Sequence, residues 1–388
     1  MKILHIINTC DPKSGGPIEG LKQYYEQYKK NNIYAEILCS DEPNSYYLKD
    51  SKLPKVNAMG KGLFNYSFNF KLLKWLEINI DRFDFLIVNG VWQFHNYAVW
   101  KIAKIKKIPY FVFTHGMLDP WFKYKYPLKH LKKIIYWYIF QHKFLNNAKK
   151  VFFTSIEEKR LAKKSFKNLL VKSEVICYGI SNSNSLYKNN KLFNKKFSKI
   201  KNKKIILFLG RLHPKKGLEN LIDAFSKIDL VKYNLHLLIV GPSSKNYKDK
   251  ILKIVQDYKL NKFITFENTV LGKLKSAIIN SCKIFALPSH QENFGIAVVE
   301  ALRYKKPVLI SDKVNIWREI KEFKAGFIGK DTAEGTKRSL IKWLKTSENE
   351  QKIISQNAYK CFNHKFNLNK TFSSFINVIK SEINDNKK

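Results

Sequence analysis

Two glutamates with seven residues between them lie in the segment SHQENFGIAVVEAL (289–302). A buried strand is predicted to end at Pro288, a polar turn carries Glu292, and a helix is predicted to begin near Phe294. Helix N-termini at the carboxyl ends of parallel strands offer backbone N–H groups to anions and hydroxyls. The pattern therefore places the Glu292 carboxylate at the mouth of a ligand site.

Glu300 lies inside that predicted helix, where every other residue from 294 to 302 is apolar or glycine. A carboxylate in apolar surroundings needs partners. Two interpretations remain open. Glu300 forms a helix-surface ion pair with Arg303, three residues further on, or it binds a vicinal diol such as a ribose.

A second motif, FLGRLHPKKG (208–217), again follows a predicted strand. Arginine can bind two oxygens at once and lysine supplies a point charge, so Arg211 and Lys216 at a strand-to-helix junction suit a diphosphate. In a chain so rich in lysine, Lys215 and Lys216 each also fit a solvated surface position. Arg211, directly after an apolar strand, is harder to explain in that way.

The first half of the chain offers DPKSGGPIEG (11–20), with Gly15 and Gly16, and FTHGMLDPW (113–121), with His115. Both segments follow predicted strands. The glycines also suit a plain turn, and a single histidine is often structural. In a molecule of two domains we expect these segments to face the same cleft as the motifs of the second half.

Short β-branched and aromatic runs alternate with helical periodicity along the whole chain, which predicts βα units around parallel sheets. The predicted fold class is α/β, with two Rossmann-like, doubly wound domains facing across a cleft. The predicted strands are 2–7, 35–39, 85–89, 110–114, 150–154 and 174–177 in the first half, and 204–210, 235–241, 263–266, 283–288, 307–311 and 326–328 in the second.

The lysine-rich segment 181–204 lacks periodicity and is predicted to be a linker. We therefore expect an N-terminal domain over 1–200 and a C-terminal domain over 201–360. A last helix over 361–388 could lie on either domain and cross back to the first.

Composition narrows the functional classes for these 388 residues. The five cysteines show no C-x-x-C spacing, so neither a disulfide framework nor a metal site is predicted. No apolar run approaches the roughly 20 residues that span a bilayer, and the opening MKILHII does not resemble a signal peptide, so we expect a cytoplasmic protein. No D-x-D pair, phosphate-binding loop or dinucleotide fingerprint is present.

The net charge of +40 is nearly all lysine. It is explained either by a composition bias or by an anionic partner. The segment WFKYKYPLKHLKKIIYWYIFQHKF (121–144) mixes lysine with tryptophan and tyrosine, and two interpretations stay open for it. It is a core-packing helix with a lysine-coated outer face, or it makes a peripheral contact with an anionic membrane. No nucleic-acid recognition motif is found.

Taken together, these segments resemble the retaining glycosyltransferases of the GT-B fold, family four (glycosyl transferases group 1), which build bacterial polysaccharides and glycolipids. The likeness covers most of the chain and is most specific at Glu292 and Glu300, with NFGIAVV between them and KKPVLIS (305–311) beyond. It implies a hexosyltransferase that uses a nucleotide-sugar donor, such as a UDP- or GDP-sugar, without metal or other cofactor. The implied acceptor is a sugar or a lipid-linked sugar.

The resemblance also implies residue roles. Glu292 would contact hydroxyls of the donor sugar, and Glu300 would bind the ribose. Arg211 and Lys216 would stabilise the diphosphate, and His115 would lie near the transferred sugar. The residues that would assist through backbone amides or a glycine loop are Asn293, Phe294, Gly295 and Ile296 in the second half and Gly15 and Gly16 in the first. The alternatives are a nucleotide-sugar epimerase on the same fold and a basic nucleic-acid-binding protein.

Overall fold

The computed structural model describes residues 1–166, 169, 171–182 and 190–384 and divides the chain into two compact units. Unit 1 comprises Met1–Ser181 and Leu368–Lys388, and unit 2 comprises Asn182–Asn367. The division lies at 181/182 and not near 200, because α8 (Lys191–Lys196) packs on α11 (Gly272–Ser281) of unit 2. Part of the predicted linker, 183–189, lies outside the described residues.

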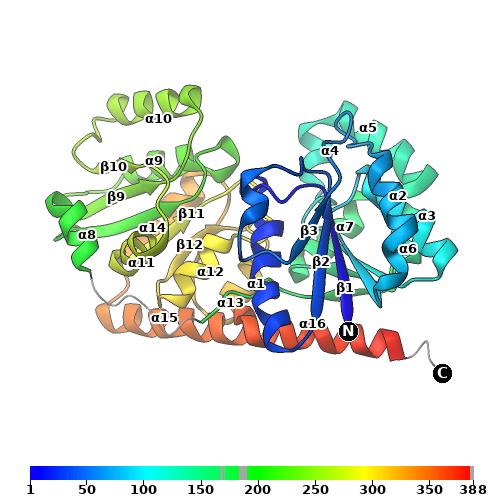
Figure 1. Ribbon diagram of the computed structural model, residues 1–388. Coiled ribbons are helices and arrows are strands. Elements are labelled where there is room, and N and C mark those ends of the chain that lie inside the picture. Colours follow the sequence, from blue (N-terminus) through cyan, green and yellow to red (C-terminus); the bar gives the residue numbers. More distant parts are fainter. Residues whose placement is uncertain (167–168, 170, 183–189, 385–388) are drawn as a thin grey trace. The chain divides into compact units, whose positions relative to one another are not determined.

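Unit 1 is built on a seven-stranded parallel sheet in the order β3-β2-β1-β4-β5-β6-β7 (Figure 1). Its strands are β1 (Lys2–Ile7), β2 (Tyr34–Cys39), β3 (Lys55–Ala58), β4 (Phe85–Asn89), β5 (Tyr110–Phe113), β6 (Lys150–Phe153) and β7 (Ser173–Val175). Its helices are α1 (Gly16–Lys30), α2 (Phe70–Asn79), α3 (Phe94–Lys106), α4 (Trp121–Lys125), α5 (Pro127–Tyr136), α6 (His142–Asn147), α7 (Ile156–Ser165) and α16 (Leu368–Asn384).

Alternate residues of β1 enter two different cores, as the two-residue period of a strand requires. Leu4 and Ile6 pack in the core that includes residues of α2, α3 and α6. Ile3 packs in the opposite core, where α1 and α16 cover the sheet (Figure 1). Tyr24 of α1 meets Phe375 of α16 with ring centroids 5.0 Å apart. The last helix therefore completes one face of the unit 1 sheet.

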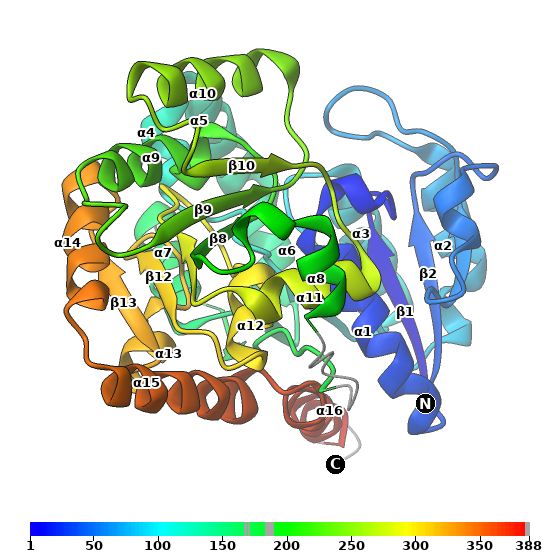
Figure 2. The same cartoon turned by 90° about the vertical axis from the view of Figure 1, so that its left-hand side faces the viewer.

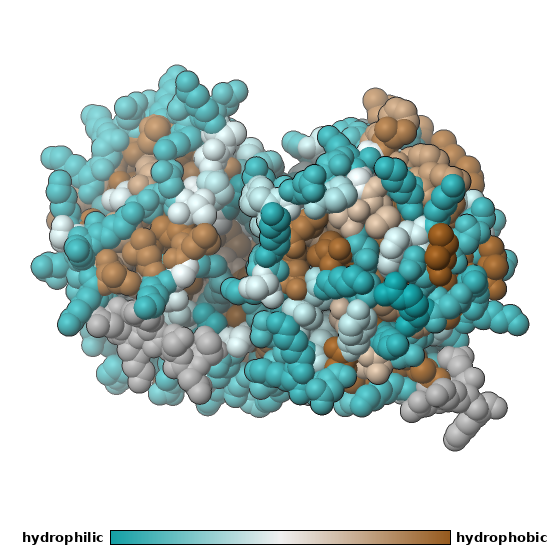
Figure 3. Space-filling model, viewed as in Figure 1, coloured by the Kyte–Doolittle hydropathy of each residue, from teal (hydrophilic) through white to brown (hydrophobic). Residues whose placement is uncertain are grey.

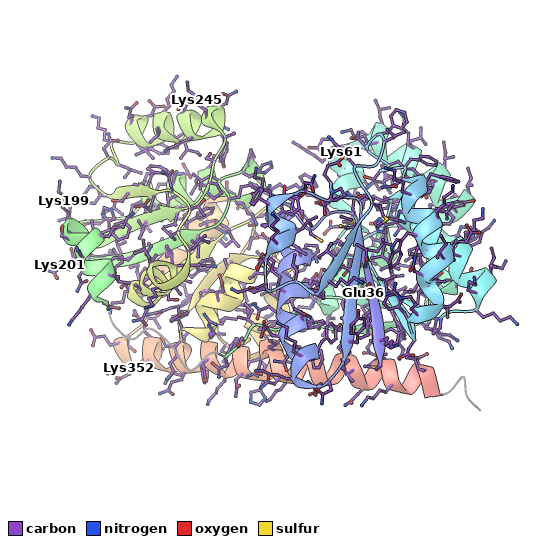
Figure 4. The ribbon with its side chains drawn as sticks, viewed as in Figure 1. Glu36, Lys61, Lys199, Lys201, Lys245 and Lys352 are labelled. Carbon is purple, nitrogen blue, oxygen red and sulfur yellow. The ribbon has the colours of Figure 1, made fainter. Side chains whose placement is uncertain are left out.

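Strand β3 was not predicted, because an edge strand is only half covered and KVNA lacks an apolar run. Glu36 of β2 holds this edge together and is buried (Figure 4). Burial alone would raise its pKa, but hydrogen bonds from Tyr34 and Asn57 and the charge of Arg82, 2.8 Å away, outweigh burial and lower the pKa. The carboxylate thereby links β2, β3 and the turn before β4.

Unit 2 contains a six-stranded parallel sheet in the order β10-β9-β8-β11-β12-β13 (Figure 2). Its strands are β8 (Lys204–Leu209), β9 (Leu235–Val240), β10 (Ile264–Glu267), β11 (Ile284–Leu287), β12 (Val308–Ser311) and β13 (Gly326–Gly329). Besides α8 and α11, its helices are α9 (Leu218–Ser226), α10 (Lys245–Asp257), α12 (Ile296–Arg303), α13 (Trp317–Glu322), α14 (Ala333–Leu344) and α15 (Glu348–Cys361).

Both sheets are doubly wound, which confirms the predicted α/β class. In unit 2 the helices α9 and α14 cover one face of the sheet, and α11 and α12 cover the other (Figure 2). The strand order reverses between β1 and β4 in unit 1 and between β8 and β11 in unit 2. Connections leave such a point toward opposite faces, so the carboxyl ends of these strands are where a ligand site is expected. Within the described residues no helix is long and apolar enough to cross a membrane.

Candidate functional site

The two conspicuous motifs of unit 2 meet at its switch point. Strand β8 is followed by the loop 210–217, which carries Arg211 and Lys216, and its neighbour β11 is followed by the loop 288–295, which carries Glu292. The two loops are about seventy residues apart in the sequence, whereas the parallel pairing of β8 with β11 brings both to one edge of the sheet.

Gly217 allows the two loops to touch. It caps α9 in the left-handed conformation, with φ of 65°. A Cβ atom at this position would lie 2.0 Å from the carbonyl oxygen of Pro288. The His290 N–H donates to the Lys215 carbonyl at 2.8 Å across the same junction. Only glycine is compatible with both this conformation and this close approach.

The Glu292 backbone is fixed on both sides. Its N–H donates to the Lys313 carbonyl at 3.0 Å, and its carbonyl accepts from the Asn315 N–H at 2.9 Å. The Glu292 carboxylate forms an ion pair with the Lys216 ammonium, and these side chains are only 17% and 22% exposed. The structure therefore joins two predicted site residues directly, in surroundings that weaken screening by water.

Helix α12 begins at Ile296, close to the predicted start near Phe294, because Gly295 adopts φ of 78° before the first helical turn. The Phe294 ring is buried and packs on Phe366 with centroids 5.6 Å apart. Asn293 accepts from the Asn315 side chain at 3.3 Å. The Phe294 side chain thus anchors the loop in the core, and its predicted role in binding rests on the backbone alone.

Positive charge converges on the loop after β8. Burial, and then the charges of Arg211, Lys215 and Lys216, lower the pKa of His213. The Arg211 side chain is exposed, and among the described residues no acidic group pairs with it. The Lys215 ammonium bonds to the side chain of Gln291 at 3.3 Å. A site with this charge pattern attracts an anion.

Glu300 has a partner that sequence reasoning missed. Its carboxylate forms an ion pair of 2.6 Å with Lys275 of α11, and the two side chains are 17% and 31% exposed. The carboxylate is therefore shielded yet reachable. Nothing in the sequence distinguishes Lys275 from the many other lysines; only the packing of α11 beside α12 selects it.

In unit 1, His115 follows β5 in a left-handed conformation, with φ of 49°. Its Nε2 lies 3.1 Å from Asn89 Oδ1, and its Nδ1 is bonded to the Tyr178 hydroxyl. Desolvation lowers the pKa of His115 to about 3. The ring is therefore neutral, with Nε2 donating to Asn89 and Nδ1 accepting from Tyr178, and both nitrogens are occupied.

Glu158 braces the His115 loop and was not among the predicted residues. Its buried carboxylate accepts from the Gly116 N–H at 2.5 Å, from the Thr114 hydroxyl at 2.7 Å, and from the N–H and hydroxyl of Thr154 at 2.7 and 2.6 Å. It lies in the first turn of α7, whose N-cap Ser155 accepts from its N–H at 3.0 Å. The sequence S-x-x-E was a readable capping signal.

The glycine loop after β1 is held in a similar way. Gly15 has φ of 94° and caps α1, which begins at Gly16. Buried Asp41 accepts from the Thr9 hydroxyl at 2.5 Å, from the Cys10 N–H at 2.6 Å and from the Tyr47 hydroxyl at 2.8 Å. These bonds fix the chain just before the loop.

One group of potential metal ligands, Cys10, Cys39 and Asp41, lies beside this loop, with donor atoms within 4.8 Å of one another. The sequence did not predict it, because neighbouring strands and not sequence spacing bring the residues together. Both Asp41 oxygens already accept hydrogen bonds. A hydrogen bond with Cys10 and then burial raise the pKa of the Cys39 thiol. The group accordingly serves packing and loop bracing.

Comparisons with known proteins bear on this geometry. Residues 189–361 match the family model "Glycosyl transferases group 1". The chain is 28% identical over 191 residues to a probable sucrose-phosphate synthase of Thermosipho melanesiensis, covering 48% of this chain and 43% of that one. It is 27% identical over 210 residues to the capsular polysaccharide biosynthesis glycosyltransferase CapM of Staphylococcus aureus, covering 51% and 53%. The chain thus spans about half the length of the curated relatives it matches.

The fold has counterparts among solved structures. The crystal structure of Anabaena Alr3699/HepE in complex with UDP and glucose superposes with a TM-score of 0.78 and 16% identity, covering 98% of this chain and 100% of that one. At this identity the likeness establishes the fold, which is the GT-B fold that the family resemblance implied.

Proposed function

We propose that this protein, whose residues 189–361 match the glycosyl transferases group 1 model, transfers a sugar from a nucleoside diphosphate sugar to an acceptor hydroxyl. The observation that carries the proposal is the shielded Lys216–Glu292 pair beside Arg211, at the switch point between β8 and β11. It combines cations for a diphosphate with a carboxylate for sugar hydroxyls.

Arg211 and Lys216 bind the diphosphate and stabilise it as it departs. Negative charge grows on the phosphate oxygens while the bond from the anomeric carbon breaks, and fixed cations lower the energy of that state. The Lys216 ammonium has three donors, so it can keep its bond to Glu292 while binding a phosphate oxygen. Protein cations supply this charge, and the transfer we propose uses no metal ion.

Glu292 accepts hydrogen bonds from hydroxyls of the transferred hexose, with Asn293 and the backbone from Phe294 to Ile296 in support. Glu300 accepts from the ribose hydroxyls. Its present pairing with Lys275 leaves one carboxylate oxygen for that role.

The acceptor oxygen bonds to the anomeric carbon on the face that the phosphate oxygen leaves, and its proton passes to that phosphate oxygen. The configuration is thereby retained. His115 has both nitrogens engaged and is neutral, so it positions its loop and accepts no proton.

We assign acceptor recognition to unit 1, through the loops of Gly15, Gly16 and His115. The complex of HepE with UDP and glucose supports a UDP-sugar as donor. The likeness to CapM supports an acceptor in cell-surface polysaccharide or glycolipid synthesis. A lipid-linked acceptor agrees with a cytoplasmic protein that makes peripheral membrane contact.

The test compares two adjacent lysines. Lys216→Ala should weaken the binding of UDP or GDP, measured by calorimetry, by about tenfold or more, the effect of losing roughly 1.4 kcal/mol. Arg211→Ala and Glu292→Ala should abolish the release of nucleotide from UDP- and GDP-sugars in the presence of membrane extract. Lys215→Ala is the matched control and should change binding by less than about twofold. Equal losses at both lysines would contradict the assigned geometry.

The same assay separates the alternatives. Release of nucleotide only with an acceptor supports transfer, whereas conversion into a second nucleotide sugar indicates an epimerase. Tight, salt-sensitive DNA binding without affinity for nucleotide sugars indicates a nucleic-acid-binding protein. In Figure 4, Lys199, Lys245 and Lys352 lie on separate parts of unit 2.

A further inference from the structure

Helix α5 of unit 1 carries an apolar stripe on its solvent side. Leu128, Leu131 and Ile135, spaced by three and four residues, are 80%, 57% and 56% exposed. On the opposite side, His130 and, just past the helix, Trp137 are buried. A helix of a soluble domain normally turns its apolar stripe toward the core. Helix α5 instead buries one side and exposes the apolar stripe to solvent on the other side.

The charge around this stripe has a single sign. Residues 121–156 include lysines but neither aspartate nor glutamate. Lys125, Lys129 and Lys132 are exposed beside the stripe. Tyr124 and Tyr138 are also exposed, by 78% and 52%. Apolar side chains flanked by lysine and tyrosine suit the boundary between water and anionic lipid.

A hairpin of unit 1 adds a second apolar projection. Leu63 and Phe68 exchange backbone hydrogen bonds of 2.8 and 2.9 Å and close a four-residue tip. Phe64 at this tip is 88% exposed, and Leu63 is 60% exposed. Phe64 has φ of 57°, which is uncommon for a bulky residue. The tight hairpin thus projects an aromatic ring into solvent from a backbone conformation that bulky residues adopt only rarely.

The hairpin and α5 are joined. The Tyr66 hydroxyl lies 2.7 Å from that of Tyr136 at the end of α5, and the two rings pack with centroids 5.8 Å apart. Lys61, just before the hairpin, lies at the end of unit 1 where α4 and α5 lie (Figures 1 and 4). Figure 3 shows apolar side chains gathered over this end.

We propose that α4, α5 and the 63–68 hairpin form one surface that docks on an anionic lipid bilayer, with Phe64 and the α5 stripe entering the headgroup region. We call it the docking surface. The lack of acidic residues in 121–156 selects lipid over a second copy of this basic chain, whose own lysines would repel it. This inference goes beyond the proposed transfer and does not depend on it, because lipid binding needs no sugar donor.

The test is co-sedimentation of the full chain with vesicles of equal parts phosphatidylglycerol and phosphatidylcholine, and with vesicles of phosphatidylcholine alone. We expect binding to the first and little to the second. The triple variant Leu128→Ser, Leu131→Ser, Ile135→Ser, and separately Phe64→Ser, should lower the partition coefficient by about tenfold or more. The matched control Val231→Ser, Leu271→Ser, Ile353→Ser replaces equally exposed apolar residues of unit 2 and should bind like the wild type.

A second pair of variants tests whether vesicle binding depends on the lysines of the docking surface or on the positive charge of the whole chain. Replacing Lys125, Lys129 and Lys132 by glutamine should weaken binding, whereas the same change at Lys199, Lys201 and Lys352 of unit 2 should not. Urea unfolding of each variant checks that it is folded. The proposal is overturned if the wild type does not bind anionic vesicles, or if both lysine variants lose binding equally. It is also overturned if the stripe variant abolishes self-association and leaves vesicle binding intact.

Discussion

The Lys216–Glu292 pair sets the charge of the candidate donor site. A pair that is about four-fifths buried is weakly screened, and each partner holds the other in place. Removing Lys216 leaves Glu292 without its countercharge next to the proposed binding position of the diphosphate. This is the physical reason why we expect Lys216→Ala to harm nucleotide binding far more than Lys215→Ala: the Lys215 ammonium donates to the side chain of Gln291, whereas the ion pair with Glu292 is formed by Lys216.

The buried Glu158 side chain fixes the conformation of the His115 loop through its hydrogen bonds. Glu158→Gln replaces one acceptor oxygen by an NH2 group that faces the donors of Gly116 or Thr154, so two bonds to a charged group are lost. We expect a loss of unfolding free energy of about 1.5–3 kcal/mol, measured by urea denaturation. Glu26→Gln on the exposed side of α1 is the control and should change stability little. An equal effect of both substitutions would show that the hydrogen bonds of Glu158 contribute little to the free energy of unfolding.

At the scale of elements, the turn into α9 determines how closely the loops after β8 and β11 approach. Gly217→Ala would place a methyl group 2.0 Å from the Pro288 oxygen and strain a φ of 65°, so the loops must separate. We expect weaker nucleotide binding together with lower stability. Gly272→Ala is the matched control, since Gly272 also has positive φ but no atom within 4 Å of the added carbon.

Calorimetry with UDP and GDP, combined with urea unfolding, distinguishes the two effects. Gly272→Ala should lose stability by about 1 kcal/mol from backbone strain alone and keep its affinity. If Gly217→Ala retained wild-type affinity, the close approach of these loops would not matter for binding.

Helix α5 illustrates a limit of periodicity. Its apolar spacing is that of an ordinary amphipathic helix, and the sequence left a core-packing role and a membrane role open. The structure turns Leu128, Leu131 and Ile135 outward. Which side of α5 faces solvent depends on the orientation of the whole helix, and the contacts of His130 and Trp137 set that orientation.

At the scale of the whole molecule, buried neutral histidines couple stability to pH. Burial lowers the pKa of His5 and His115 to about 3 and that of His95 and His236 to about 4. The unfolded chain has the ordinary value of 6.5, so below that pH it binds protons that the folded state excludes. Stability is therefore fully present above pH 6.5 and falls below it, by up to about 1.4 kcal/mol per pH unit for each histidine.

Urea midpoints measured from neutral pH down to about pH 5 check this dependence. His95→Leu removes one of the buried groups and should reduce the slope, whereas substitution of the exposed His364 should not. A wild-type midpoint that stays constant over this range would contradict the prediction.

The sequence alone determined the α/β class, the family resemblance and nearly every buried strand, because apolar runs between turn residues specify parallel strands locally. It also singled out Arg211, Glu292 and Glu300 as candidate site residues, since each lies in the loop after a strand or in an otherwise apolar helix, and Lys216 followed chiefly from the family resemblance. The edge strand β3 was not predicted, because it lacks the run of apolar residues that indicates a strand.

Only the tertiary structure decided which side chains meet. The switch in strand order puts the loop after β8 beside the loop after β11, and it pairs Glu292 with Lys216. The position of α11 beside α12 allows Glu300 to form an ion pair with Lys275. The first turn of α7 places the Glu158 carboxylate against the His115 loop. Such pairings depend on strand order and helix orientation, which arise from burial over the whole chain and leave no local pattern in the residues themselves.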